Sequence, residues 1–174
     1  MLRMKESKYY HLEFVYFLSS YLQVLVVILN NIIINLSFAY QSSGSSILYS
    51  NWNDGEPNND FGTENCVAVV GKKGKWFDQN CTITKKSICE DPDDEATYYN
   101  ACPEGWDLIN KKCYRFVDQT LKFDTAIEMC KAIGGQVFEP TYEVQEQLVK
   151  EYYFTRYQQQ AFWIGVSDRS KEGR

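Results

Sequence analysis

A polar segment over residues 53–65 carries most of the side chains that could do chemistry. Glu56, Asn58 and Glu64 supply carboxylate and amide oxygens within it. Asp78 adds another carboxylate beyond the next apolar stretch. Calcium in proteins takes about six to eight oxygen ligands of these kinds. The segment therefore has donors that could wrap a calcium ion, and an ion with open positions accepts neighbouring hydroxyls of a sugar. Composition alone favours the alternative, an ordinary solvated turn.

The composition argues against several classes of function. The chain of 174 residues has a net charge of −5 and no long run of Lys or Arg that would neutralise a nucleic-acid backbone. The single histidine, His11, precedes the first apolar run, which leaves no histidine-activated nucleophile. Glu56 and Glu64 could in principle hydrolyse a glycoside as paired carboxylates, but calcium ligation accounts for both with fewer assumptions. We therefore expect a binding protein, not an enzyme and not a nucleic-acid partner.

The cysteines predict an oxidising compartment. They number six, lie in the last two thirds of the chain, and show no C-x-x-C spacing typical of zinc or redox motifs. A disulfide framework is the better interpretation. Two sequons, at Asn35 and Asn80, are candidate glycosylation sites. Together these features predict an extracellular chain, either secreted or attached to the cell surface. The cysteines are Cys66, Cys81, Cys89, Cys102, Cys113 and Cys130.

Residues 1–36 differ in character from the rest of the chain. Three basic residues, Arg3, Lys5 and Lys8, precede an apolar stretch over 14–34 that polar residues interrupt. A bilayer span needs about twenty predominantly apolar residues. We interpret residues 1–36 as a targeting segment, with possible membrane anchoring through 14–34, or as a segment outside the domain. A buried helix is the remaining alternative.

Two predicted hairpins must position the polar segment. Apolar residues alternate with polar ones from Phe38 to Trp52 around a Ser/Gly turn, which predicts the first hairpin. Residues 66–70 and 75–77 are separated by the turn 71–74 and predict the second. The polar segment joins them as a loop long enough to be functional.

A second region is predicted to be mostly helical. An acidic stretch beginning at Glu90 contains a proline and indicates a linker over 91–101. Beyond it, residues 112–117 predict a strand. Apolar residues then recur at helical spacing until the Gly134-Gly135 pair, which predicts the end of a helix.

The last part of the chain is predicted to form another helix and a strand. A helix is expected over 143–157, with Thr141 near its N-cap. Val144, Leu148 and Tyr152 share one face of this helix. The apolar residues 162–166 then predict a strand.

Several short motifs resemble those of the C-type lectin-like family. Glu56-Pro57-Asn58 looks like the Glu-Pro-Asn motif of mannose-type members, and Trp76-Phe77-Asp78 looks like their Trp-Asn-Asp motif. Trp163-Ile164-Gly165-Val166 resembles the family's Trp-Ile-Gly-Leu signature, and the segment from Cys102 to Trp106 resembles the N-terminal disulfide hairpin of long-form members. The resemblance implies an α+β C-type lectin-like fold with two helices, small antiparallel sheets, a long ligand loop and disulfide bridges.

The resemblance also assigns roles to the candidate residues. It implies a cis peptide bond before Pro57 and a ligand with mannose-type equatorial hydroxyls. Phe77 stands where the family has a ligating asparagine, which removes one calcium oxygen and puts calcium binding in question; Asp60 is a candidate replacement. The alternative is a domain that binds a protein ligand without calcium. The residues implied to bind both calcium and the sugar are Glu56, Asn58, Glu64 and Asp78.

The two halves of the implied domain occur in reversed order. The ligand-loop half, residues 37–90, comes first, and a truncated helical half, residues 102–174, follows the linker 91–101. Either the chain holds parts of two adjacent domains of a tandem protein, or it is one permuted domain; we favour the former. The implied bridges join Cys66 to Cys81 and Cys102 to Cys113, and in a permuted domain Cys89 to Cys130.

Overall fold

The computed structural model describes most of the chain from residue 38 onward. The chain divides into two units, residues 1–34 and residues 35–174. In the first unit, residues 22–26 are helical. No helix among the described residues is long and apolar enough to cross a membrane. The sequon at Asn35, most of the segment 14–34 and most of the linker lie outside the described residues. Those residues are 22–26, 29, 38–71, 73–92, 101–157 and 160–169.

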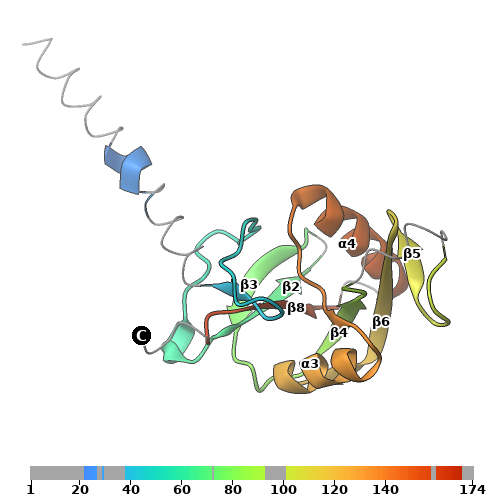
Figure 1. Ribbon diagram of the computed structural model, residues 1–174. Helices are drawn as coiled ribbons and strands as arrows, with labels where there is room; N and C mark the ends of the chain where they lie inside the picture. The colour runs from blue at the N-terminus through green and yellow to red at the C-terminus, as the bar shows by residue number, and fades with distance from the viewer. Residues whose placement is uncertain are drawn as a thin grey trace, which may run out of the picture. The chain divides into compact units, whose positions relative to one another are not determined.

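The unit of residues 35–174 is built on one mixed sheet with a helix on either side (Figure 1). The strand order is β3-β2-β8-β4-β6-β5, with β1 paired to β8 and β7 paired to β4. These elements confirm the predicted α+β class. Their bounds are β1 Ala39–Tyr40, η1 Asp60–Gly62, β2 Cys66–Val70, β3 Lys75–Gln79, β4 Lys85–Glu90, β5 Asp107–Ile109, β6 Lys112–Leu121, α3 Phe123–Ala132, β7 Gln136–Val137, α4 Glu143–Tyr157 and β8 Phe162–Ser167.

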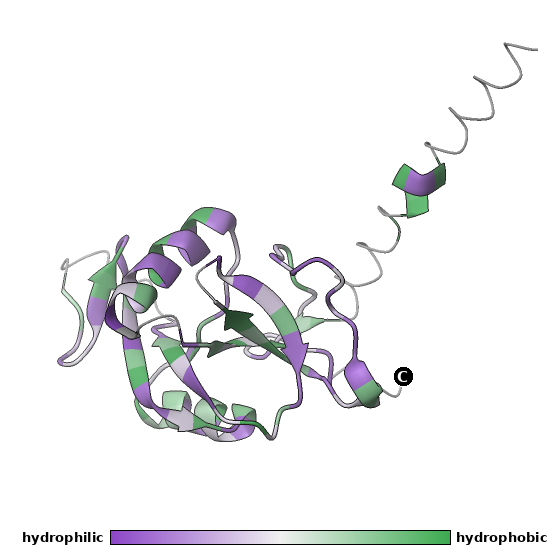
Figure 2. Ribbon diagram, turned by 180° about the vertical axis from the view of Figure 1, so that it is seen from behind, coloured by the Kyte–Doolittle hydropathy of each residue, from purple (hydrophilic) through white to green (hydrophobic). Residues whose placement is uncertain are grey.

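Strand β8 is the centre of the sheet. It pairs antiparallel with β2 and parallel with β4, and all six of its residues are buried. A strand covered on both faces reads as a nearly continuous apolar run, which residues 162–166 show. Figure 2 shows the hydrophobic strands gathered in the middle of the unit. The second predicted hairpin is present as β2 and β3, paired antiparallel from Cys66–Gln79 to Val70–Lys75. The first is reduced to a single bridge between Ala39 and Ser46.

Helix α3 matches its prediction closely. Phe123, Ala126 and Cys130 recur at helical spacing and face the core. The helix ends where Gly134 takes a left-handed φ of 81°, and the Gly135 N–H donates to the Cys130 carbonyl at 2.8 Å. This return bond satisfies a carbonyl that the helix end would otherwise leave open.

Helix α4 buries a different face from the apolar one that the sequence indicates. Val144 and Leu148 are 59% and 37% exposed. The buried face instead includes two polar side chains, because the hydrogen-bond partners they need lie beneath the helix. At the start of the helix, the Thr141 backbone N–H and hydroxyl both donate to Gln145 Oε1. The buried residues of α4 are Gln145, Glu146, Val149 and Tyr153.

Three disulfides join the described elements. Cys66 is bonded to Cys81 and Cys102 to Cys113, each within its own half, with Cα–Cα distances of 5.2 and 5.6 Å. The third joins Cys89 on β4 to Cys130 on α3 across the two halves, at a Cα–Cα distance of 5.4 Å. These are the pairs that the family resemblance implies for a permuted domain.

Candidate functional site

The base of the polar loop is held by paired tryptophans. Trp52 forms a parallel bridge with Trp76 on β3, and their rings meet edge to face at 5.6 Å. The Asn53 N–H donates to the Trp76 carbonyl at 3.0 Å, so the first residue of the loop is fixed to the strand. Phe38 packs on Trp52 at 4.9 Å. The loop therefore leaves the sheet from a rigid aromatic footing.

Asp78 organises the loop from beneath. Side chains alternate along a strand, so Asp78 points to the same side of β3 as the buried Trp76. It is fully buried, and its two carboxylate oxygens accept hydrogen bonds from the backbone N–H groups of Asn58 (3.0 Å) and Asn59 (2.7 Å). One carboxylate thus fixes the backbone of the predicted motif.

Glu56 and Asn58 lie side by side next to Asp78. The peptide bond between Glu56 and Pro57 is cis. Asn58 Nδ2 donates to Glu56 Oε1 at 2.9 Å, whereas Glu56 Oε2 is buried and receives no hydrogen bond. Burial, followed by the neighbouring Asp78 and Glu64 carboxylates, raises the pKa of Glu56 to about 7. Burial and the neighbouring carboxylates therefore favour the protonated form of Glu56 when no cation is bound.

Glu64 closes the loop through Asn59. The Glu64 N–H donates to Asn59 Oδ1 at 3.1 Å, and Glu64 Oε2 accepts from the Asp60 N–H at 3.0 Å. Asn59 adopts a left-handed φ of 45°, a conformation that asparagine tolerates better than most residues. Asn59 was not predicted as a site residue, although it connects Asp78 with Glu64. Its only sequence signal is an asparagine between two loop residues that could ligate a cation.

Phe61 is the most exposed apolar side chain of the loop. It lies in the short η1 turn with a φ of 54°, and 92% of its surface is exposed. Phe77, in contrast, is half-buried on β3, where it is paired with Ala68. Because neighbouring strand residues alternate, the Phe77 side chain points away from the side that carries Asp78. Phe77 was singled out from the sequence, whereas the exposed Phe61 was not.

The donor chemistry of the site fits a hard cation only in part. Carboxylates and an amide lie together, and a buried Glu56 oxygen lacks a donor, as expected where a cation would bind. However, the Asp78 oxygens are turned toward backbone N–H groups. Among the described residues, no three Asp, Glu, His or Cys side chains are arranged as a metal site.

Comparison with known proteins identifies the family. The Lectin C-type domain model matches residues 30–91. Human C-type mannose receptor 2 is 25% identical over 150 residues, covering 83% of the chain and 10% of the receptor. Human lymphocyte antigen 75 is 30% identical over 142 residues, covering 78% of the chain and 8% of that protein. Mouse secretory phospholipase A2 receptor is 28% identical over 144 residues, covering 75% and 10%. With the fold described above, these matches show that the chain belongs to the C-type lectin domain family.

The matches cover most of this chain but only a small part of each relative. No solved structure matches the chain significantly. The chain spans only about a tenth of the length of the curated relatives. A match that covers 83% of the chain must nevertheless run through both halves, well beyond the 62 residues of the family model. The order of loop half and then helical half therefore also occurs within C-type mannose receptor 2.

Proposed function

We propose that this chain is an extracellular recognition module that binds mannose-type glycans with the help of calcium. The observation that supports this most is the loop folded around buried Asp78, with Glu56 and Asn58 side by side and one Glu56 oxygen buried without a donor. An unpaired, buried carboxylate oxygen is costly unless a cation or donor reaches it. The three disulfides fit an oxidising, extracellular setting.

The residues that would hold calcium are the ones that crowd together in the loop. Calcium would supply positive charge and open coordination positions for two sugar hydroxyls. The chain's own part is orientation, because Asp78 fixes the backbone at Asn58 and Asn59. Glu56 can accept a hydrogen bond from a sugar hydroxyl and the Asn58 amide can donate one. The proposed ligands are Glu56, Asn58, Glu64 and Asp78.

Phe77 sets the strength of the proposed site. A phenylalanine side chain offers no oxygen, so the site has one ligand fewer than the Trp-Asn-Asp motif provides. We expect weak calcium binding, because calcium affinity depends on the number and charge of its ligands. Asp60 remains a proposed replacement; its backbone N–H is used by Glu64.

A second candidate function is recognition of a protein ligand without calcium. It is favoured by the exposed Phe61 at the loop tip, since aromatic side chains often anchor protein interfaces. It also agrees with the absence of a converged acidic cluster among the described residues. Membrane attachment through 14–34 and glycosylation at Asn35 and Asn80 stay predictions.

Thermal unfolding with calcium and with a chelator distinguishes the two functions. A ligand that binds only the folded state raises the apparent melting temperature. We expect calcium to stabilise the chain slightly and to stabilise Phe77→Asn more strongly, and mannose-bearing beads to retain both in calcium but not in chelator. Asp54→Asn is the matched control, because Asp54 is an exposed carboxylate of the same loop. If only Phe77→Asn responds, the protein-ligand function replaces the glycan function.

A further inference from the structure

Three lysines gather at the turn between β2 and β3. Lys150 reaches this turn from α4, and its Nζ donates to the Lys73 carbonyl at 3.1 Å. Lys75 is the first residue of β3, and its Nζ donates to Asn51 Oδ1 at 2.7 Å. Lys73 itself is exposed at the turn. We call Lys73, Lys75 and Lys150 the lysine cluster.

Gly74 and Asn51 hold the cluster together. Gly74 has a left-handed φ of 61°, and a Cβ at this position would lie 1.8 Å from Lys150 Cδ. The glycine therefore leaves the space in which Lys150 crosses the turn. The Gly74 carbonyl accepts from Asn51 Nδ2 at 3.0 Å, and the same asparagine binds Lys75 through its Oδ1. One turn and one asparagine thus fix two ammonium groups in the same region of the surface.

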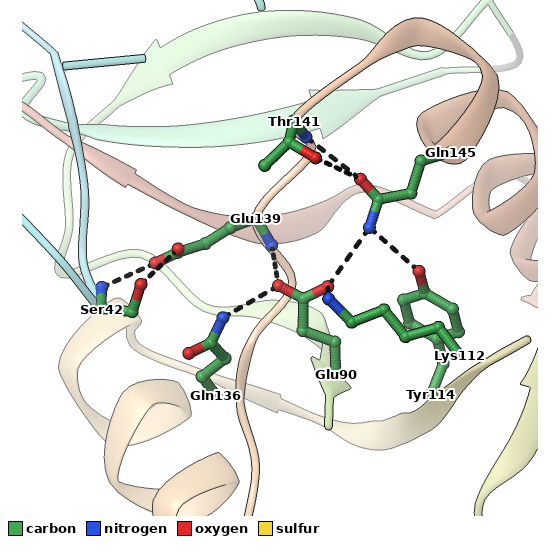
Figure 3. Close-up of polar contacts among 8 residues, drawn as sticks. All are labelled: Ser42, Glu90, Lys112, Tyr114, Gln136, Glu139, Thr141 and Gln145. Carbon is green, nitrogen blue, oxygen red and sulfur yellow. Dashed lines mark hydrogen bonds and ion pairs between the residues drawn. The ribbon is translucent and has the colours of Figure 1, made fainter. Parts of the chain in front are cut away.

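The positive charge of the cluster is not matched by carboxylates. Elsewhere, Lys112 Nζ pairs with Glu90 Oε2 at 3.3 Å (Figure 3), and Lys86 pairs with Asp118. Within the described part of the chain, no member of the lysine cluster forms an ion pair of this kind. The hydrogen bonds of Lys75 and Lys150 go to neutral oxygens. An ammonium group carries three donors, so donors remain for a ligand.

The acidic residue beneath the cluster does not reach the surface. Glu146 is fully buried, and its Oε1 accepts from Asn51 Nδ2 at 3.3 Å and from Trp76 Nε1 at 3.2 Å. Burial raises the pKa of Glu146, which reduces the negative charge beneath the lysines. The cluster is therefore a local concentration of positive charge on a chain whose net charge is −5.

We propose that the lysine cluster is a second binding site, whose ligand is a sulfated glycan. Sulfate esters are permanently charged, and lysine ammonium groups bind such oxygens as point charges with several donors. A long phosphate backbone would run beyond three lysines onto an acidic protein, whereas a short sulfated segment matches their number. Three disulfides fit the extracellular setting in which sulfated glycans occur.

This site goes beyond the calcium-dependent function proposed for the ligand loop. Asp78 lies three residues along β3 from Lys75, about 10 Å at the usual rise of a strand. The lysine cluster shares no residue with the proposed calcium ligands. Binding of a sulfated glycan at the cluster therefore needs no calcium.

Retention of the full chain on heparin beads tests the proposal. We expect the wild-type chain to bind heparin in chelator at low salt and to elute as salt rises, because salt screens surface charges. The double variant Lys75→Gln with Lys150→Gln should bind a heparin oligosaccharide roughly three- to tenfold more weakly, as for the loss of two surface ion pairs. A wild-type chain that does not bind heparin in chelator would overturn the proposal.

A matched control removes two positive charges elsewhere. Lys111 lies in the β5–β6 turn and Lys131 in the last turn of α3, and both are exposed. The double variant Lys111→Gln with Lys131→Gln should bind the heparin oligosaccharide within about twofold of wild type, since distant surface charges are screened. Equal weakening by both double variants would show attraction by net charge alone and would overturn the site.

Two further probes define the ligand class. Desulfated heparin keeps the sugar backbone but loses the sulfates, so we expect no retention. Its retention at the level of heparin would overturn the assignment to sulfate. Single-stranded RNA of equal charge should bind more weakly than heparin, because its phosphates extend beyond the cluster. Tighter binding of the RNA would overturn the assignment to a glycan.

Thermal unfolding covers the case in which the lysine variants do not fold. A ligand that binds only the folded state raises the apparent melting temperature, so heparin should raise that of the unaltered chain in chelator. No shift at saturating heparin would overturn the proposal. Retention on mannose-bearing beads in calcium reports on the ligand loop separately, and we expect the folded Lys75→Gln, Lys150→Gln variant to match wild type there.

Discussion

The interface between the loop half (residues 37–90) and the helical half (residues 102–174), which we call the seam, and the ligand loop both contain buried or half-buried carboxylates, but their charges are compensated differently. In the seam, Glu90 is matched by the Lys112 ammonium, two side-chain amides and a backbone N–H. In the loop, burial and then the neighbouring Asp78 and Glu64 carboxylates raise the pKa of Glu56, and within the described part of the chain no Lys or Arg forms an ion pair with these three residues. Glu90 therefore has its own counter-ion in the seam, whereas the loop carboxylates have none among the described residues.

This difference separates a region whose buried charge stabilises the fold from a region whose charges favour binding of a cation. A buried charge with a complete set of partners holds one arrangement of the halves. A group of like charges without a counter-ion destabilises the free protein and favours whatever brings a cation. We therefore expect removal of the Lys112 charge to destabilise the seam and removal of the Glu56 charge to stabilise the free protein.

The largest expected effect follows from removing the cation of the seam. Lys112→Met leaves the Glu90 carboxylate buried without its counter-ion, and we expect a loss of about 3 kcal/mol in the free energy of unfolding. This is the low end of the usual range, because the Lys112 side chain is 26% exposed. Urea unfolding measures the loss. The double variant Lys112→Met with Glu90→Gln should recover part of it; no recovery would mean that Lys112 acts through packing alone.

A smaller effect is expected from pH at the second carboxylate of the seam. Burial raises the pKa of Glu139 from 4.5 to about 7. The folded state therefore holds a proton that the unfolded state has released between these values, so this group's contribution to stability falls as pH rises through that window. We expect Glu139→Gln to match wild type near pH 4.5 and to gain on the order of 2 kcal/mol over it near pH 8. A pH-independent difference in urea unfolding would argue against this assignment.

The smallest effect on stability is expected at the tip of the loop. Phe61 is 92% exposed, so Phe61→Ala should change the free energy of unfolding by less than about 0.5 kcal/mol. Its effect on binding decides between the proposed functions. If a protein ligand is recognised, retention of that ligand should fall at least about tenfold, since exposed aromatic anchors carry much of such interfaces. Leu48→Ala, at another 85% exposed apolar residue, is the control.

Much of the fold could be predicted because its signals are local. Helix α3 was bounded by its spacing and by Gly134-Gly135, and the β2–β3 hairpin by alternation around a glycine turn. The polar contacts of the seam could not be predicted, because their residues lie far apart in sequence, although the family resemblance implied the Cys89–Cys130 bridge for a permuted domain. Glu90 opens an acidic stretch that reads as a linker, yet it is the buried last residue of β4.

The buried face of α4 could not be predicted from the sequence for the same physical reason. Hydrophobic periodicity predicts that Gln145 and Glu146 are surface residues. Both are buried, because Gln145 hydrogen-bonds to Tyr114 and Glu146 accepts a hydrogen bond from Trp76. In the ligand loop, residue types indicated a group of oxygen donors that the structure brings close together, and their role in binding stays a prediction. The role of Asn59 was not visible, because it depends on a backbone N–H that reaches Asp78.

The stability of Glu56→Gln at pH 8, in chelator and in calcium, tests most directly whether the loop holds uncompensated charge for a cation. Gln keeps the size of Glu56 and removes one of the crowded charges. We expect the variant to be more stable than wild type in chelator and to gain less stability from calcium. A variant that is less stable in chelator, with an unchanged response to calcium, would contradict the claim that the loop holds uncompensated charge for a cation.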